Sequence, residues 1–401
     1  MHVTIADKLP DSAINELNKL GVEVSNRPEL TSSDLEKGLP ETDALIVRST
    51  EISRECIKKS PQLMLIVRAG AGVNTIDMDA ASEFGIYVAN CPGQNSIAVA
   101  ELTFGLILAL DRHIAENVAD FRAGKWNKGA YSKADGLFGK VIGVVGVGQI
   151  GLEVIRRAKA FGMPVIAWSR SLTHQQADEL GVTYAKSVKQ VASACDILTV
   201  HLALNSDTRG IISKDVLSYL KDGAMVINTA RDGVIDEDAL YKDVSSGRLR
   251  AGLDVFSEEP EYKQGEVKSR FQEVKGVVVT HHIGASTRQA QDAVATDAVD
   301  IIRGYLQTGK VRNWLNRSEQ TEAPWQLIVR HLDKPGVIAN VMNELKQADI
   351  NAQELENVIF QKKMTACCTI QLDAKPSDEA MQRIRARDEE VISAVLMKNR
   401  G

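Results

Sequence analysis

Short apolar runs alternate with helix-like segments through the middle of this chain, and this alternation constrains the fold more than any other feature. The apolar runs are Val141–Val145, Val165–Trp168, Asp196–His201, Ala224–Asn228, Ala251–Val255 and Val277–Thr280. The segments between them that fit amphipathic helices are Ile150–Phe161, Ser187–Ala194, Lys214–Leu220 and Glu237–Ser246. Strands and helices repeated at this spacing predict a doubly wound α/β sheet of parallel strands.

A glycine loop closes the first of these runs. It reads GVGQIG between a strand and a helix, which is the context that makes this motif specific for a dinucleotide. Gly146 allows the tight turn, Gly148 lets a pyrophosphate approach the backbone, and Gly151 lets the helix pack closely on the sheet. We expect the helix N-terminus, at Gln149 and Ile150, to face the phosphates.

The second strand of this sheet offers no carboxylate for the ribose of the cofactor. In NAD-binding proteins an acidic residue commonly ends that strand and binds the 2′-hydroxyl, whereas here Trp168 is followed by Ser169 and Arg170. Arg170 can accommodate the 2′-phosphate of NADP, or it stacks on adenine or faces water while NAD binds. We therefore expect NAD, with NADP as an open alternative.

Three later strands each lead to a polar residue suited to acid–base or anion chemistry, namely Arg231, Glu259 and His282. Ligands of open α/β sheets bind at the carboxyl ends of the strands, so these side chains should converge. A guanidinium holds a carboxylate, a histidine takes a hydroxyl proton near neutral pH, and a carboxylate raises the pKa of that histidine. Together they indicate hydride transfer on a hydroxy acid, with His281 as a rival base. Each residue alone is more often an ordinary surface or turn residue.

A smaller α/β unit precedes the doubly wound sheet. Its strand-like runs and helices are Val3–Ala6, Ser12–Leu20, Ala44–Val47, Arg54–Lys59, Met64–Val67 and Ile86–Ala89, and the apolar helix Ser96–Ala109 leads out of it. Its candidates for substrate contact are Arg48, Ser49, Arg68, Gly70, Ala71 and Gly72 at the strand ends, and Asn95 before the long helix. The arginines can grip a phosphate, and the amides around the glycines can bind a carboxylate. The alternative is that both arginines face solvent and pair with carboxylates.

A polar stretch, Asn313–Pro324, separates these units from a third. Beyond it, strand and helix patterns follow in the order βαββαβ, which predicts a ferredoxin-like α+β domain. The segments are Trp325–Arg330, Val337–Gln347, Ala352–Phe360, Ala366–Leu372, Asp378–Arg387 and Val391–Leu396.

Composition narrows the function further. A net charge of −5 gives no support to nucleic-acid binding. The longest apolar stretch, Leu102–Leu110, is far shorter than the ~20 residues of a membrane helix, so we expect no membrane partner. The cysteines show no metal-binding spacing and indicate a reducing compartment, which we take to be the cytoplasm. They are Cys56, Cys91, Cys195, Cys367 and Cys368.

Four motifs together resemble the D-isomer-specific 2-hydroxyacid dehydrogenases, over essentially the whole chain. They are Gly146–Gly151, Asn228–Gly233, Leu253–Pro260 and His282–Thr287. The likeness is strongest to the branch that oxidises 3-phosphoglycerate to 3-phosphohydroxypyruvate in the first step of L-serine synthesis. The rivals are an NADPH-dependent glyoxylate or hydroxypyruvate reductase and, in another class, a nucleotide-sensing corepressor-like protein.

The resemblance implies roles for individual residues. Arg231 would bind the substrate carboxylate, and Glu259 with His282 would form the acid–base pair. The cofactor would lie against Ala230, Asp254, Gly284 and His282, and the substrate phosphate against Arg48 and Arg68. One departure is His281, where the family commonly has proline. Another is Ser169, where this branch commonly has an acidic residue.

The resemblance also implies an organisation. A flavodoxin-like substrate-binding domain would comprise residues 1–95 and 287–316, and a Rossmann dinucleotide-binding domain residues 96–286. A linker at 317–324 would lead to residues 325–401, which resemble an ACT domain. His331, Asp333 and Asn351 would there bind L-serine between paired domains, unless the domain serves assembly alone. A homodimer built around the nucleotide-domain helices, or a homotetramer, is expected.

Overall fold

The computed structural model describes residues 1–260, 265–318, 323–387 and 389–399. The chain forms two compact units, Met1–Asn316 and Arg317–Gly401. None of the helices in these described ranges is long and apolar enough to cross a membrane.

The first sheet is parallel throughout and has the strand order β2-β1-β3-β4-β5. This is the flavodoxin-like order. Its strands are β1 (His2–Ile5), β2 (Glu23–Asn26), β3 (Ala44–Val47), β4 (Leu65–Arg68) and β5 (Tyr87–Asn90). The helices around it are α1 (Asp11–Lys19), α2 (Ser32–Leu35), α3 (Arg54–Lys58), α4 (Met78–Glu83) and α12 (Arg288–Thr308). Buried side chains of α1 and α12 pack on one face, and those of α2, α3 and α4 on the other.

The second sheet is also parallel, with the order β12-β11-β10-β9-β6-β7-β8. Its strands are β6 (Ile142–Val145), β7 (Val165–Trp168), β8 (Thr183–Tyr184), β9 (Ile197–Val200), β10 (Met225–Asn228), β11 (Arg250–Leu253) and β12 (Val277–Val279). Numbered from β6, this is the Rossmann order with one further strand. The order reverses between β6 and β9, and a crevice for a dinucleotide opens at such a reversal.

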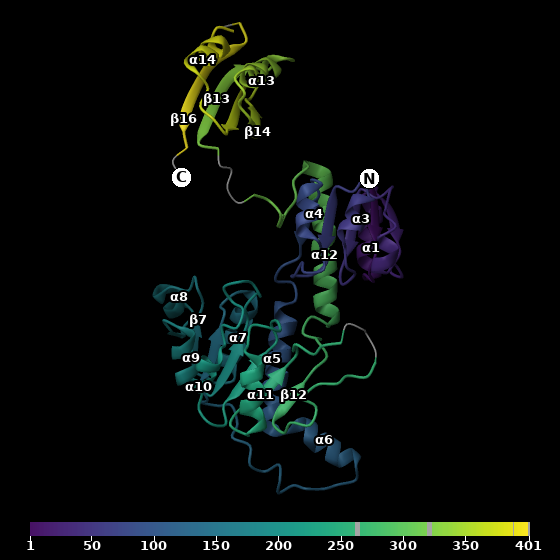
Figure 1. Cartoon of the computed structure of the whole chain (residues 1–401), viewed down its shortest axis with the longest axis vertical. Coiled ribbons are helices and arrows are strands. Elements are labelled where there is room, and N and C mark those ends of the chain that lie inside the picture. Colours follow the sequence, from purple (N-terminus) through teal and green to yellow (C-terminus); the bar gives the residue numbers. More distant parts are fainter. Residues whose placement is uncertain (261–264, 319–322, 388, 400–401) are drawn as a thin grey trace. The chain divides into compact units, whose positions relative to one another are not determined.

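Helices cover both faces of the second sheet (Figure 1). They are α5 (Ser96–Arg112), α7 (Gln149–Ala160), α8 (His174–Glu179), α9 (Val188–Ala194), α10 (Lys214–Ser218) and α11 (Glu237–Ser245). Apolar side chains of α5, α7 and α8 share one core cluster, and those of α9, α10 and α11 share the other. The predicted doubly wound architecture is confirmed.

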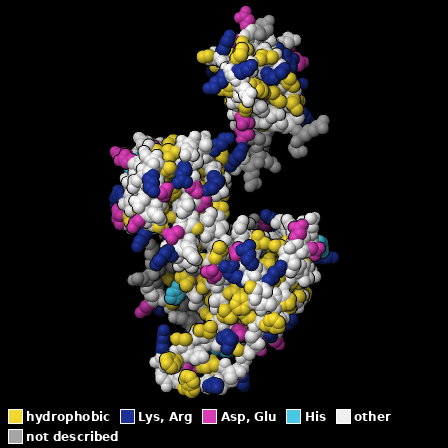
Figure 2. All heavy atoms as spheres, turned by 180° about the vertical axis from the view of Figure 1, so that it is seen from behind, with side chains coloured by type: hydrophobic (Ala, Val, Ile, Leu, Met, Phe, Trp, Pro, Cys, Tyr) yellow, Lys and Arg dark blue, Asp and Glu magenta, His cyan; other side chains and the backbone are white. Residues whose placement is uncertain are grey.

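Helix α6 (Ile114–Arg122) was not anticipated, and it differs from the others because none of its residues is buried. It carries several exposed apolar side chains, and the loop after it adds Trp126, which is 82% exposed. Figure 2 shows apolar side chains gathered at this end of the Met1–Asn316 unit.

The second unit is an antiparallel sheet with two helices on one face. Its order, β14-β15-β13-β16, is that of a ferredoxin-like fold and confirms the predicted α+β class. The elements are β13 (Trp325–Leu332), α13 (Val337–Gln347), β14 (Ala352–Ile359), β15 (Thr365–Leu372), α14 (Asp378–Arg385) and β16 (Val391–Lys398). Side chains of α13 and α14 pack with β13 and β15 in a single core.

We predict that Gly143→Ala destabilises the protein by about 1–3 kcal/mol, because β6 and α9 meet too closely for another methyl group. A Cβ at Gly143 would lie 2.5 Å from Cγ1 of Val191 and 2.9 Å from Sγ of Cys195. Thermal unfolding provides the measurement. The control is Gly105→Ala on the exposed side of α5, where a Cβ meets nothing within 4 Å, so the midpoint should rise. An unchanged midpoint for Gly143→Ala would show that α9 can shift.

Candidate active site

The glycine loop between β6 and α7 has the geometry of a dinucleotide cradle. Gly146 has φ +99°, and a Cβ there would collide with the carbonyl of His201. A Cβ at Gly151 would collide with the carbonyl of Gly146, so helix and loop are in direct contact. Around Gly148, in contrast, nothing lies within 4 Å of the missing Cβ. The two outer glycines close the turn, and the middle one leaves room for a phosphate at the helix N-terminus.

The other predicted cofactor contacts follow neighbouring strands at the same edge of the sheet. Ser169 and Arg170 come after β7, Ala230 after β10, Asp254 after β11, and His282 and Gly284 after β12. The structure therefore brings these residues to the edge that carries the glycine loop. Their individual roles remain proposals.

His282 and Glu259 form a hydrogen-bonded pair. Nδ1 of His282 lies 2.8 Å from Oε2 of Glu259, while Oε1 of Glu259 accepts the backbone N–H of Phe256 at 3.0 Å. The bond to Glu259 raises the pKa of His282, against the opposing effects of burial and of Arg231. Because Nδ1–H donates to the carboxylate, Nε2 is the nitrogen that can accept a proton. His281 has no such partner among the described contacts.

Asp254 holds the segment that carries His282. Its buried carboxylate accepts hydrogen bonds from Oγ1 of Thr280 at 2.6 Å, from N–H of Ile283 at 2.9 Å and from N–H of Gly284 at 2.8 Å. The backbone carbonyl of Asp254 accepts the N–H of His282 as well. These bonds fix a left-handed backbone at His282, where φ is +51°, a conformation that costs energy in a non-glycine residue.

Arg231 extends from the end of β10 toward the loop that follows β4. Its Nη1 donates to the carbonyl of Ala230 at 2.6 Å. Its Nη2 lies 2.9 Å from the position that a Cβ of Gly72 would occupy. Any side chain at Gly72 would press on this guanidinium, so the predicted carboxylate nest at Gly70–Gly72 and the predicted carboxylate-binding arginine lie together. Ala71 belongs to the same loop, and its carbonyl accepts Nδ2 of Asn90 at 2.6 Å.

A cleft of about 180 Å³ joins His282 to most of the predicted substrate contacts. Its polar lining residues are Lys8, Arg48, Ser49, Arg68, Asn95, His282, Ser286 and Gln291. The structure thus groups Arg48, Ser49, Arg68, Gly70 and Asn95 around the histidine. Sequence reasoning missed Lys8, although it follows β1 as Arg48 follows β3. The strand-end rule would have found it.

The cleft holds an excess of positive charge. In the described part of the chain, Arg48, Arg68 and Arg231 form no ion pair with a carboxylate, and Nε of Arg68 is buried without a hydrogen-bond partner. Burial, followed by the charges of Arg231 and Arg48, lowers the pKa of Arg68. Arg48 and Arg68 line the cleft, and Arg231 lies close enough to repel Arg68, so the charges favour a multiply charged anion there.

Asp7 shapes the Arg48 loop. It sits at the end of β1, and its carboxylate accepts the backbone N–H groups of Arg48 at 2.7 Å, Ser49 at 2.9 Å and Thr50 at 3.0 Å, together with Oγ of Ser49. Burial alone would raise the pKa of Asp7, but these bonds hold it below its ordinary value. The loop is therefore preorganised around a buried anion.

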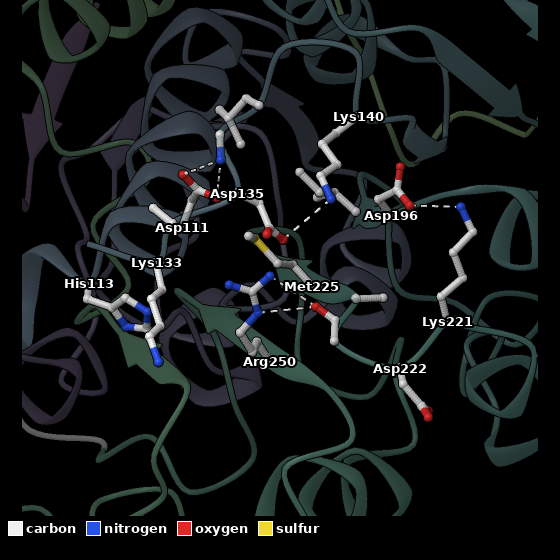
Figure 3. Close-up of a pocket in the computed structure, with 16 residues that line it drawn as sticks. Asp111, His113, Lys133, Asp135, Lys140, Asp196, Lys221, Asp222, Met225 and Arg250 are labelled. Atoms are coloured by element: carbon white, nitrogen blue, oxygen red, sulfur yellow. Dashed lines mark hydrogen bonds and ion pairs between the residues drawn. The ribbon is translucent and has the colours of Figure 1, made fainter. Parts of the chain in front are cut away.

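A second hollow, of about 390 Å³, lies at the opposite edge of the second sheet (Figure 3). Its charged groups largely satisfy one another, as in the pairs Asp196–Lys221 at 2.8 Å and Asp135–Lys140 at 3.4 Å. Arg250 donates to the carbonyl of Gly223. This hollow borders the amino ends of β9, β10 and β11. Ligands of such sheets bind at the carboxyl ends of the strands, so the hollow lies away from the expected ligand site.

The predicted effector residues of the second unit do not converge within one chain. His331 is buried, and both of its ring nitrogens are hydrogen-bonded, to the carbonyl of Leu332 at 2.7 Å and to the side chain of Asn357 at 3.1 Å. Asp333 lies at the same end of β13 as His331. Asn351 directly precedes β14, and the start of β14 lies beside the end of β15, which in turn pairs with Trp325 at the opposite end of β13. At ~3.3 Å per residue, about 20 Å of strand separates Asn351 from His331.

Residues 104–284 match the sequence profile of the NAD-binding domain of D-isomer specific 2-hydroxyacid dehydrogenases. A hydroxypyruvate reductase of Thermotoga maritima is 41% identical over 303 residues, which cover 75% of this chain and 96% of that protein. A D-3-phosphoglycerate dehydrogenase of Methanocaldococcus jannaschii is 35% identical over 355 residues, or 88% of this chain. The match covers 66% of that enzyme, slightly less than two thirds.

A solved structure extends these similarities to three dimensions. The NAD⁺-bound 3-phosphoglycerate dehydrogenase of Entamoeba histolytica has a TM-score of 0.65 and 26% identity. The match covers 79% of this chain and 99% of that one.

We predict that Glu259→Gln lowers the pH at which His282 loses its proton, because the neutral amide no longer stabilises the imidazolium. The raised pKa of His282 keeps the proton bound to a higher pH in the wild type than in the variant. An NMR titration of the histidine ring protons provides the measurement. His281→Gln is the matched control and should leave that titration in place. A midpoint in Glu259→Gln at or above the wild-type value would contradict the pairing.

Proposed function

The chain belongs to the D-isomer specific 2-hydroxyacid dehydrogenase family, and on that premise we propose that it oxidises 3-phospho-D-glycerate to 3-phosphohydroxypyruvate, the first step of L-serine synthesis. One observation carries the choice of substrate. Arg48 and Arg68 line the cleft with His282, Arg231 is close enough to repel Arg68, and none of the three has a carboxylate partner among the described residues. One arginine suffices for a carboxylate, so the other two indicate a second anionic group.

The proposed reaction assigns each side chain one task. Nε2 of His282 takes the proton of the substrate hydroxyl, and Glu259 stabilises the imidazolium that forms. Arg231 holds the carboxylate and polarises the neighbouring carbonyl as it develops. A nicotinamide bound at the carboxyl edge of the sheet would take up the hydride. Asp254 acts through the backbone, because its hydrogen bonds set the position of the histidine ring.

The phosphate would lie among the side chains of the first sheet. Arg48 offers charge-assisted hydrogen bonds from a loop that Asp7 already fixes, so little ordering is needed on binding. The buried unpartnered Nε of Arg68 gives a further donor. Ser49 and Asn95 line the same cleft and can add neutral hydrogen bonds.

A second candidate, reduction of hydroxypyruvate or glyoxylate with NADPH, is favoured by the hydroxypyruvate reductase relative and by Ser169-Arg170. Such small substrates lack a phosphate, so this candidate leaves Arg48 and Arg68 without a ligand. The nucleotide-sensing alternative has no use for the Glu259–His282 pair.

We also propose that the protein forms a homodimer through the nucleotide-domain helices. The exposed apolar side chains of α6 and of the loop after it support this assembly. Binding of L-serine at His331, Asp333 and Asn351 stays a proposal as well. For His331 it would require replacing bonds that already satisfy both ring nitrogens.

We predict that His282→Ala lowers kcat for 3-phosphoglycerate oxidation by about 10²- to 10⁴-fold, because it removes the general base that the proposed reaction assigns to the hydroxyl proton. Binding of NADH, followed by its fluorescence, should change little. His281→Ala is the matched control and should keep most of the activity. Normal turnover by His282→Ala would remove the histidine from the mechanism.

We predict that Arg48→Gln separates phosphorylated from unphosphorylated substrates. Loss of a charge-assisted hydrogen bond should reduce kcat/KM for 3-phosphohydroxypyruvate by about 10- to 100-fold, with little change for hydroxypyruvate or glyoxylate. Steady-state rates with each compound give the ratio. Arg54→Gln, which breaks an exposed pair with Glu83 in the same sheet unit, is the control. Equal losses on all substrates would favour the reductase.

A further inference from the structure

Arg170, at the carboxyl end of β7, is paired with a carboxylate from a different part of the sequence. Its Nη1 lies 3.3 Å from Oδ2 of Asp207 in the loop after β9. The strands β7 and β9 flank β6 on opposite sides, so both of these residues belong to the edge that holds the glycine loop. Asp207 therefore lies within reach of the end of β7, the strand end that lacks an acidic residue.

The turn that carries Asp207 is well ordered. Oδ1 of Asn205 accepts the backbone N–H groups of Asp207 and Thr208, both at 3.0 Å. Oγ1 of Thr208 donates to the carbonyl of Ala203 at 2.6 Å and accepts the N–H of Asn205 at 2.9 Å. These bonds fix the backbone on both sides of the aspartate, so its carboxylate is presented from a defined position.

Both members of the pair are open to solvent. The side chain of Arg170 is 83% exposed and that of Asp207 is 70% exposed, so their attraction contributes little to folding stability. The next cation along the loop, Arg209, points elsewhere, because its Nη1 lies 3.1 Å from the Cβ position of Gly233 after β10. Among the described residues, Arg170 is the cation that pairs with Asp207, so a ligand at the end of β7 would meet both charges.

In this fold the adenosine ribose lies at the end of the second strand, here β7. A 2′-phosphate placed there would gain attraction from Arg170 and suffer repulsion from Asp207. The neutral 2′-hydroxyl of NAD could donate a hydrogen bond to Asp207 without that repulsion. The aspartate would also neutralise the cation that otherwise attracts the phosphate of NADP.

We propose that Asp207 is a specificity-determining residue for the cofactor. From the loop after β9 it supplies the carboxylate that the end of β7 lacks. By pairing with Arg170 it also weakens the attraction of that cation for a 2′-phosphate, so the protein binds NAD(H) more tightly than NADP(H). The inference rests on the dinucleotide site of the proposed function and is independent of which hydroxy acid reacts there.

Direct binding of NADH and NADPH to the full chain, followed by nicotinamide fluorescence without substrate, tests this. The wild type should bind NADH more tightly. Asp207→Asn should lower the ratio of the NADPH Kd to the NADH Kd by about five- to tenfold, the size expected for one exposed charge facing a dianion. Arg170→Gln should raise the ratio, and the double variant should lie between the single ones. The differences should shrink as salt is raised from about 0.05 M to about 0.5 M.

Asp215→Asn is the matched control. Asp215 on helix α10 forms an exposed ion pair with Lys189 on helix α9, at 2.5 Å. Its substitution should keep the wild-type ratio of the NADPH Kd to the NADH Kd. A ratio within twofold of wild type in Asp207→Asn, or a wild type that binds NADPH more tightly, would overturn the inference while the proposed reaction stands. Failure of the wild type to bind either dinucleotide would overturn both.

Discussion

The buried carboxylate of Asp254 is the interaction on which the rest of the site depends. It ties the end of β11 to the segment after β12, and this segment carries His282 in a left-handed conformation that is unfavourable without support. With the backbone fixed, Nδ1 of the histidine lies against Glu259, and the residue lines the cleft. A buried carboxylate that accepts backbone N–H groups thus sets the orientation of the exposed ring of His282.

Asp7 plays the corresponding part in the other sheet. It organises the loop that carries Arg48, so two carboxylates at strand ends, one in each sheet, prepare the two sides of the cleft. The cost of this arrangement is the burial of Arg68 and its repulsion by Arg231 and Arg48, which together lower the pKa of Arg68. Substrate binding would relieve that repulsion, so part of the binding energy is stored before the ligand arrives.

Periodicity and strand-end chemistry predicted the central strands, the glycine loop and the approach of His282 to Glu259, because these features depend on local pattern and on the parallel arrangement of one sheet. Arg48 and Arg68 belong to the other sheet, so their place beside His282 followed from the family resemblance and not from strand order. The sequence did not predict the two edge strands β2 and β8, because β2 has no buried residue and β8 has only two residues. Helix α6 escaped because it has no buried face to create a periodic signal. The sequence also did not predict the pairing of Asp207 with Arg170, for a different reason. This pairing depends on the strand order, which places β7 and β9 on either side of β6.

The distance between His331 and Asn351 in the antiparallel sheet has a thermodynamic consequence. A small amino acid cannot span about 20 Å of strand, so a ligand held by both residues must join two chains. Such a ligand would stabilise the association of two protomers, and its apparent affinity would therefore rise with protein concentration. Dilution would then weaken the response to the effector even where each binding surface is intact.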